Sequence, residues 1–207
     1  MAVTYIKRYR MELRLDRLPI ELRQFQPLPT EFELLPWTPR LLNQHAEVKW
    51  ASFRDEIDVH VFPCLGERDG CRRLMRELSE RKDFIPQATW LACRLGDAPV
   101  NLPATGKWNM PGRQPAAGAY HAVGTVQGLL ASSREGAIQN LGVHPAFRDL
   151  GLGGAMLRAA VNGFASAGCR YVHLEVTVHN SAAIRLYERV GFHRVETLFK
   201  ISEVQFA

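Results

Sequence analysis

One stretch of this chain constrains its fold more than any other, because it combines the signs of a strand, a tight turn and a helix. Residues 137–143 form a short, mostly apolar run that is typical of a buried strand. Pro145 ends that strand, because proline has no N–H to donate to a ladder. Three glycines then permit a sharp turn, and apolar residues recur at helical spacing after it. The glycines are Gly151, Gly153 and Gly154, and the apolar residues are Met156, Leu157, Ala160, Val161 and Phe164.

The glycine turn of this stretch suits an anionic ligand. A helix that begins directly after glycines presents free N–H groups, and the helix dipole adds positive potential at the same point. Arg148, just ahead of the turn, supplies further donors for a phosphate. A tight connection without any ligand would show the same glycines, so the turn alone leaves both interpretations open.

Periodic patterns predict the other elements of the chain. Strands are expected at residues 9–15, 32–37, 89–95, 120–131, 171–178 and 192–204, and helices at residues 41–54, 69–83 and 182–190. A strand, a crossover helix and a second strand follow one another around the glycine turn. Residues 137–143 and 171–178 are therefore predicted to be parallel neighbours in one sheet.

Prolines divide the chain into an extension and a domain. Five prolines lie between residues 19 and 39, so residues 1–40 are predicted to form an N-terminal extension packed on a domain of residues 41–207. Residues 96–118 carry four prolines among glycines and polar residues, which predicts a long flexible loop. That loop would either fold over a substrate or form a surface insertion.

Composition narrows the classes of function. The chain has 207 residues, 46% of them hydrophobic, and a formal net charge of +5. No apolar run approaches the roughly 20 residues that cross a membrane, so no membrane partner is expected. Basic residues alternate with apolar and acidic ones, which is typical of a solvated face and not of a nucleic-acid surface. The four cysteines lack metal-binding spacing, which predicts no metal site and reduced thiols in the cytoplasm.

Two runs of sequence resemble a known enzyme family. In the first, Arg148, Gly151 and Gly153 match the acetyl-CoA-binding pattern of the GCN5-related N-acetyltransferases, in which Arg or Gln is followed by two residues, Gly, one residue, and Gly or Ala. The second run, residues 174–192, is similar to the other half of that motif system. In detail it is most similar to the ribosomal-protein alanine acetyltransferase branch. The resemblance extends over about residues 120–199.

The resemblance implies an α/β fold with a mixed, mostly antiparallel central sheet flanked by helices. A splayed pair of parallel strands would form the acetyl-CoA cleft, and Gly142 would ease the bulge that separates them. Backbone groups of Leu141 and Val143 would pair with the pantetheine arm. The glycine turn would hold the pyrophosphate of coenzyme A. A dinucleotide is the rival ligand, but a neat βαβ unit with an acidic ribose partner is missing here. The implied cofactor-binding residues are Leu141, Val143, Arg148, Leu150, Gly151, Leu152, Gly153, Gly154, Ala155, Asn180 and Tyr187.

The family reaction is direct transfer of an acyl group from a thioester to an amine, and the resemblance assigns Tyr187 to protonate the leaving thiolate. Without the motif, a tyrosine on an apolar helix face would be read as core. Asn180 would contact the cofactor or a water, or simply cap the helix.

Glu175 is the predicted general base, acting directly or through water. A carboxylate in a central strand is costly unless it faces a cleft or a partner, so an arginine-paired structural role is the alternative. His173 and His121 are weaker alternatives for the base. Many relatives carry an acidic residue where this chain has Gln139 and Asn140, which gives Glu175 more weight.

The sequence therefore predicts an acetyl-CoA-dependent N-acetyltransferase whose acceptor is a primary amine. The acceptor is either a protein N-terminus or a small-molecule amine, because the acceptor-binding segments lie where the resemblance is weakest. The alternative function is an acyl-CoA-binding sensor or structural protein that transfers little. The first or the last strand could pair across a homodimer.

Overall fold

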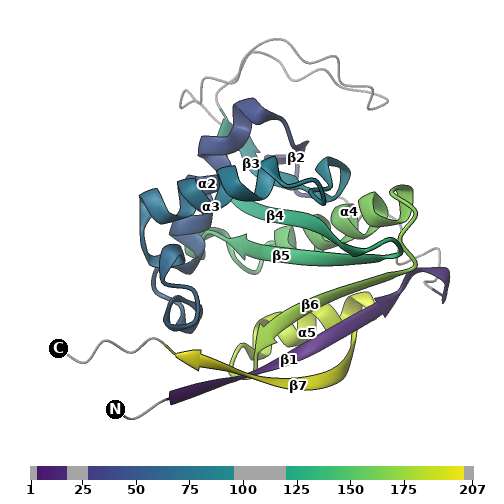
Figure 1. Ribbon diagram of the computed structural model, residues 1–207. Coiled ribbons are helices and arrows are strands. Elements are labelled where there is room, and N and C mark those ends of the chain that lie inside the picture. The colour runs from purple at the N-terminus through teal and green to yellow at the C-terminus, as the bar shows by residue number, and fades with distance from the viewer. Residues whose placement is uncertain (1–3, 18–27, 96–119, 203–207) are drawn as a thin grey trace.

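A computed structural model describes residues 4–17, 28–95 and 120–202, and within these ranges the chain forms one seven-stranded sheet. The strand order is β2-β3-β4-β5-β6-β1-β7 (Figure 1). All neighbours are antiparallel except β5 and β6, which are parallel. The strands are β1 (Thr4–Arg14), β2 (Phe32–Pro36), β3 (Trp90–Leu95), β4 (Tyr120–Ser132), β5 (Glu135–Val143), β6 (Tyr171–Thr177) and β7 (His193–Ser202). The predicted mixed, mostly antiparallel sheet is confirmed.

Helices cover both faces of the sheet. In Figure 1, α2 and α3 lie in front of β4 and β5, while α4 and α5 lie behind the sheet. The main hydrophobic core joins buried side chains of α4 and α5, such as Phe164, to the apolar side chains of β1 and β6, such as Met11 and Leu174. The helices are α2 (Leu42–Phe53), α3 (Arg68–Glu80), α4 (Leu152–Ser166) and α5 (Ser181–Val190). Short 3₁₀ turns lie at Leu15–Arg17, Pro39–Leu41, Ile57–His60, Pro63–Gly66, Pro86–Ala88 and Pro145–Phe147.

The first strand is part of the sheet itself, which corrects the predicted extension of residues 1–40. β1 lies between β6 and β7 and pairs with both, and β2 pairs with β3. The pattern of residues 9–15 predicted a strand, but the pairing partners of a strand are set by contacts far away in sequence. Because both edges of β1 are occupied, β1 has no edge left for a dimer partner, whereas β7 lies at the edge of the sheet and pairs on one side only among the described strands.

The two parallel strands pair over a short distance and then separate. Their register ends at the pair Ala137 and His173. Further along β5, Asn140 and Leu141 together oppose the single residue Val126 of β4, because the register shifts there. This bulge gives β5 the extra bend that bulges produce, and it follows directly after the last residues that pair with β6.

The bulge depends on Asn140, and not on Gly142 as the sequence suggested. Asn140 has a φ of +51°, a conformation that asparagine tolerates better than most residues. Gly142 serves close packing instead. A Cβ added there would lie 2.6 Å from Cε2 of Phe53 and 2.8 Å from the Cβ of Ser52, so glycine lets α2 approach the sheet.

Two further expectations concern the rest of the chain. The predicted loop at residues 96–118 lies outside the described residues. Among the helices that the structure describes, none is long and apolar enough to cross a membrane.

Candidate active site

The candidate site lies where the parallel strands have separated. Residues 138–143 of β5 pair with β4 along one edge, and their other edge has no strand partner in the described part of the chain. The glycine turn follows the carboxyl end of β5, and α5 follows the carboxyl end of β6 (Figure 1). Carboxyl ends of parallel strands meet at one edge of a sheet, where open α/β sheets bind ligands.

The glycine turn leaves the start of α4 without a cap from the protein. Gly151 has a φ of +80°, which favours glycine, and a Cβ added there would meet nothing within 4 Å. Within the described ranges, no side chain caps the helix, and its first turn contains no acidic residue. Leu152, Gly154 and Ala155 are buried, whereas Leu150 and Gly151 are exposed. The free N–H groups of the first turn are therefore suited to an anion.

Gly153 brings the start of α4 close to α5. A Cβ added at Gly153 would lie 3.2 Å from Cδ2 of Leu186 on α5 and 3.8 Å from Cγ2 of Val143 on β5. The glycine turn therefore lies directly beside α5 and the carboxyl end of β5.

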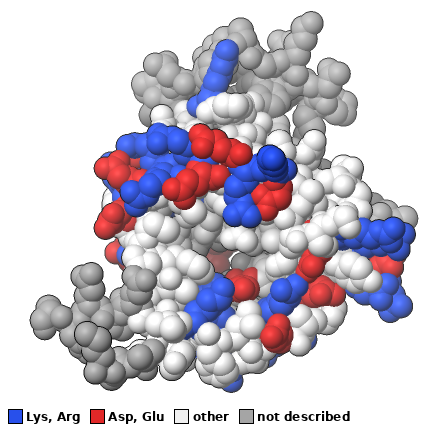
Figure 2. All heavy atoms as spheres, viewed as in Figure 1, with Lys and Arg blue, Asp and Glu red and all other residues white. Residues whose placement is uncertain are grey.

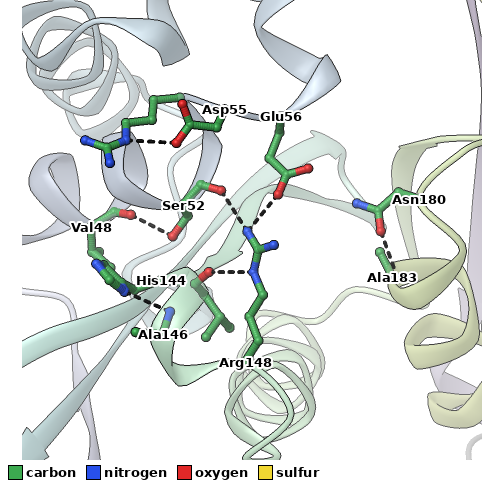
Figure 3. Close-up of polar contacts among 11 residues, drawn as sticks. Val48, Ser52, Asp55, Glu56, His144, Ala146, Arg148, Asn180 and Ala183 are labelled. Atoms are coloured by element: carbon green, nitrogen blue, oxygen red, sulfur yellow. Dashed lines mark hydrogen bonds and ion pairs between the residues drawn. The ribbon is translucent and has the colours of Figure 1, made fainter.

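Arg148 reaches across to α2 and the segment that follows it, as Figure 3 shows. Its Nη2 donates to Oε1 of Glu56 at 2.7 Å and to the carbonyl oxygen of Ser52 at 3.2 Å. Its Nε donates to the carbonyl oxygen of Val143 at 3.3 Å. Arg148, which was predicted to bind a phosphate, is therefore paired with acceptors of the protein itself. One of these acceptors is Val143, on the strand predicted to pair with the pantetheine arm.

Tyr187 lies on α5 and is 7% exposed. Its ring packs near that of Phe192, with the centroids 6.1 Å apart. Its hydroxyl has no hydrogen-bond partner among the residues that the structure describes. Burial raises the pKa of Tyr187 well above the usual value; the negative charge of Asp58 raises it further and the positive charge of Arg8 lowers it. The hydroxyl therefore stays protonated and is free to donate a proton or a hydrogen bond.

Glu175 on β6 is ion-paired, as the structural alternative expected. Its Oε2 lies 2.7 Å from Nζ of Lys200 and 3.6 Å from Nε of Arg8. Its side chain remains 29% exposed. Both cations stabilise the ionised carboxylate, so the structure shows an anchored charge with some access to solvent.

The two histidines considered as alternative bases lie elsewhere. Nδ1 of His173 is 2.7 Å from Oε1 of Glu135, at the end of the sheet where β5 and β6 still pair. Burial and the nearby Arg10 lower the pKa of His173, while Glu135 opposes this shift. His121 is exposed on β4, with its ring centroid 6.3 Å from that of Phe147.

Asn180 caps α5. Its side-chain oxygen accepts a hydrogen bond from the N–H of Ala183 at 3.1 Å (Figure 3). This is the N-cap role considered from the sequence, and it places Asn180 opposite the glycine turn at the start of α5.

The structure also brings together Arg8, Asp58 and Thr177, a polar cluster that the sequence did not predict. Arg8 of β1 is ion-paired with Asp58 and donates a hydrogen bond from Nη1 to Oγ1 of Thr177 at 2.8 Å. Thr177 Oγ1 lies 3.1 Å from Oδ1 of Asp58. Arg8 lies just before the strand expected at residues 9–15, and Asp58 belongs to no motif, so no signal in the sequence would bring them together.

Taken together, the mixed sheet, the separated parallel strands and the uncapped helix after a glycine turn define an acyltransferase-like α/β fold. The family model for the acetyltransferase (GNAT) family matches residues 87–192, about half of the chain. The chain belongs to this family. Neither this match nor the relatives below single out the ribosomal-protein alanine acetyltransferase branch.

Individual relatives share parts of the chain. A mycothiol acetyltransferase from Nocardiopsis dassonvillei is 39% identical over 77 residues, which are 37% of this chain and 23% of that protein. A GCN5-related N-acetyltransferase from Sphaerobacter thermophilus superimposes with a TM-score of 0.61 at 22% identity, covering 97% of this chain and 52% of that chain. This chain thus spans only about half, or less, of these two relatives.

A third relative has a similar length. A structure of an aminoglycoside N-acetyltransferase in complex with CoA superimposes with a TM-score of 0.54 at 13% identity, covering 88% of this chain and 97% of that chain. At such identities the likeness of the solved structures concerns the fold alone.

Proposed function

We propose that this protein transfers an acetyl group from acetyl-CoA to a primary amine by direct attack. One observation carries the proposal: β5 separates from β6 after Ala137, which leaves an edge of β5 open beside the uncapped start of α4. Membership of an acetyltransferase family supports the same reaction.

The open edge and the glycine turn suit the two ends of coenzyme A. In the proposal, the backbone of Leu141 and Val143 pairs with the amides of the pantetheine arm as an added strand would. The first-turn N–H groups of α4 hold the pyrophosphate. The full set proposed for the cofactor is Leu141, Val143, Arg148, Leu150, Gly151, Leu152, Gly153, Gly154, Ala155, Asn180 and Tyr187.

Arg148 would exchange partners when the cofactor binds. It now occupies the carbonyl oxygen of Val143 and the carboxylate of Glu56. A pyrophosphate offers its guanidinium a more highly charged acceptor. The proposal therefore has Arg148 leave the strand edge as the pantetheine arm takes its place.

Tyr187 and Glu175 divide the proton transfers. The thioester supplies an activated acyl carbon: the amine nitrogen bonds to this carbon and the carbon–sulfur bond breaks. Tyr187 protonates the leaving thiolate, and Glu175 takes the proton lost by the amine through a water. A proton passing between them through solvent restores both groups. The carboxylate of Glu175 is already paired with Arg8 and Lys200, so Tyr187 is the better supported of the two assignments.

The acceptor is a protein N-terminus or a small-molecule amine. Two of the three relatives above have a small molecule in their names, mycothiol in one and an aminoglycoside in the other. A test panel therefore needs aminoglycosides as well as peptides with a free N-terminus.

Thiol release from acetyl-CoA over this panel tests the proposal. We expect turnover with at least one amine, and for Tyr187→Phe a kcat lowered about 100-fold or more, the usual range for loss of a general acid. Binding of acetyl-CoA by the variant should be unchanged. Tight cofactor binding without turnover on any amine would contradict the proposal and indicate an acyl-CoA sensor.

The four cysteines are all free thiols. We propose that the protein works in a reducing compartment, the cytoplasm. In the homodimer that the sequence suggested, the edge of β7 that faces away from β1 is one strand edge available for pairing.

A further inference from the structure

An ionic cluster joins the α2–α3 connection to the far half of the sheet. Asp58 lies on the turn Ile57–His60, Arg8 on β1 and Thr177 at the end of β6. The side chains of Arg8 and Asp58 are only 6% and 13% exposed. Charged side chains of both signs gather along the hollow between the α2–α3 layer and the strands below it (Figure 2). Burying such a pair is costly, so its position calls for an explanation.

Asp58 uses only one of its two carboxylate oxygens within the protein. Arg8 Nη1 and Thr177 Oγ1 both contact Oδ1. Oδ2 has no hydrogen-bond partner among residues 4–17, 28–95 and 120–202. Oδ2 is not among the buried side-chain atoms that lack a partner, so a donor from water or from a ligand can reach it.

Arg8 is fixed so that it orients Asp58. Its Nη1 holds Asp58 and Thr177, and its Nη2 donates to the backbone oxygen of Glu175 at 3.2 Å. The ring of Phe62 covers the guanidinium, with its centroid 5.5 Å from Cζ. Nε is buried without a hydrogen bond, and the Oε2 of Glu175 lies 3.6 Å from it. With these donors committed, Arg8 acts as a support for Asp58.

The same cluster acts on the proposed acid. After burial, the charge of Asp58 is the largest influence on the pKa of Tyr187, and the charge of Arg8 opposes it. Glu175 is not among the charges that shift the pKa of Tyr187, and both of its ion pairs, with Lys200 and Arg8, use Oε2. Asp58 is therefore the carboxylate whose field reaches the Tyr187 hydroxyl and which retains an unused oxygen.

We propose that Asp58 binds the acceptor amine as an ammonium through Oδ2, and that Arg8 and Thr177 are positioning residues that hold the carboxylate in place. This inference rests on the proposed acetyl transfer and names the class of its acceptor. The acceptor is a primary alkylamine, which carries a positive charge at neutral pH because its pKa lies near about 8 to 10. The bound ammonium gives one proton to solvent before its nitrogen attacks the thioester, and the second proton goes to Glu175 as proposed above.

Asp58→Asn tests the assignment, because it removes the charge and keeps the shape. Thiol release is measured with a peptide bearing a free N-terminal alanine and with an aminoglycoside. We expect the KM for the amine to rise about 10- to 100-fold, as for loss of a hydrogen bond to a charged group. The KM for acetyl-CoA should stay within about twofold, because in this proposal Asp58 binds the amine and makes no contact with the cofactor.

Asp55→Asn is the matched control. Asp55 lies three residues earlier in the same connection, its side chain is 81% exposed, and it pairs with Arg54. This variant should leave both KM values unchanged. A folded Asp58→Asn protein with an unchanged KM for the amine would overturn the assignment.

Two additions keep the test decisive. If Asp58→Asn loses its thermal transition, Asp58→Glu keeps the charge and moves the free oxygen by one methylene, and an unchanged amine KM in it overturns the assignment. Calorimetric binding of the same amines to the CoA-loaded protein separates the two proposals. Amine binding without turnover refutes the acetyl transfer, while its loss in Asp58→Asn still supports the Asp58 site; no binding and no turnover overturns both.

Discussion

Lys49 carries an amine that is normally charged, yet its side chain is buried in the protein. It is fully buried on α2, and in the described part of the chain its Nζ contacts only the sulfur of Met75, at 3.9 Å. Burial lowers its pKa to about 8, which Cys71 and Cys64 partly oppose. One turn earlier, burial and the charge of Lys49 lower the pKa of His45 to about 3. The inner face of α2 therefore favours neutral side chains.

Replacing Lys49 by methionine should stabilise the protein. The shift of the pKa from 10.5 to about 8 corresponds to a penalty of about 3 kcal/mol at neutral pH, and methionine fills a similar volume without a charge. We expect the free energy of unfolding of Lys49→Met at pH 7 to exceed that of the wild type by about 2 kcal/mol, measured by chemical denaturation. Lys82→Met, at an exposed position, should show no change.

The effect of Lys49 depends on pH in a defined direction. Its pKa is lower in the folded chain than in the unfolded chain, so the unfolded chain binds more protons between about pH 8 and 10.5 and wild-type stability rises across that range. The penalty is complete below pH 8. The advantage of Lys49→Met should therefore shrink as the pH rises towards 10.5. A difference that stays constant from pH 7 to pH 10 would contradict the burial of a charged amine.

At the scale of elements, the bulge of β5 opens the site, and Asn140 is the residue that allows it. A β-branched residue tolerates a positive φ poorly, whereas glycine adopts it freely. Asn140→Val should lower the free energy of unfolding by about 1–2 kcal/mol and weaken the binding of acetyl-CoA. Asn140→Gly should retain both properties. Equal behaviour of the two variants in denaturation and calorimetric titration would show that the bulge does not need this conformation.

The elements themselves were largely predictable, because their signals are local. The helix expected at residues 41–54 is α2 (Leu42–Phe53), and the strand expected at residues 171–178 is β6 (Tyr171–Thr177). The parallel pairing followed from the order strand, helix, strand and is confirmed. The position of the bulge was wrong, since glycine is the usual sign of unusual backbone and Asn140 takes that role here.

At the scale of the whole molecule, the α2–α3 connection forms ion pairs with both halves of the sheet, on either side of the point where β5 and β6 separate. Glu56 holds Arg148 next to the glycine turn, and Asp58 holds Arg8 on β1. Glu56 and Asp58 are two residues apart, and together they link the glycine turn, which is predicted to bind phosphate, to β1 and to the end of β6 at Thr177. These contacts join residues that lie about 50 to 170 positions apart, so no periodicity or motif could have predicted them. The same holds for β1, whose neighbours come from the end of the chain.

A crystal structure with acetyl-CoA bound tests the central claim most directly, since the claim concerns where the cofactor lies. We expect pyrophosphate oxygens within about 3 Å of the N–H groups at the start of α4 and the thioester sulfur within hydrogen-bond reach of the Tyr187 hydroxyl. The pantetheine arm should replace Arg148 at the carbonyl oxygen of Val143. A cofactor bound away from the separated strands, or a sulfur out of reach of Tyr187, would contradict the account.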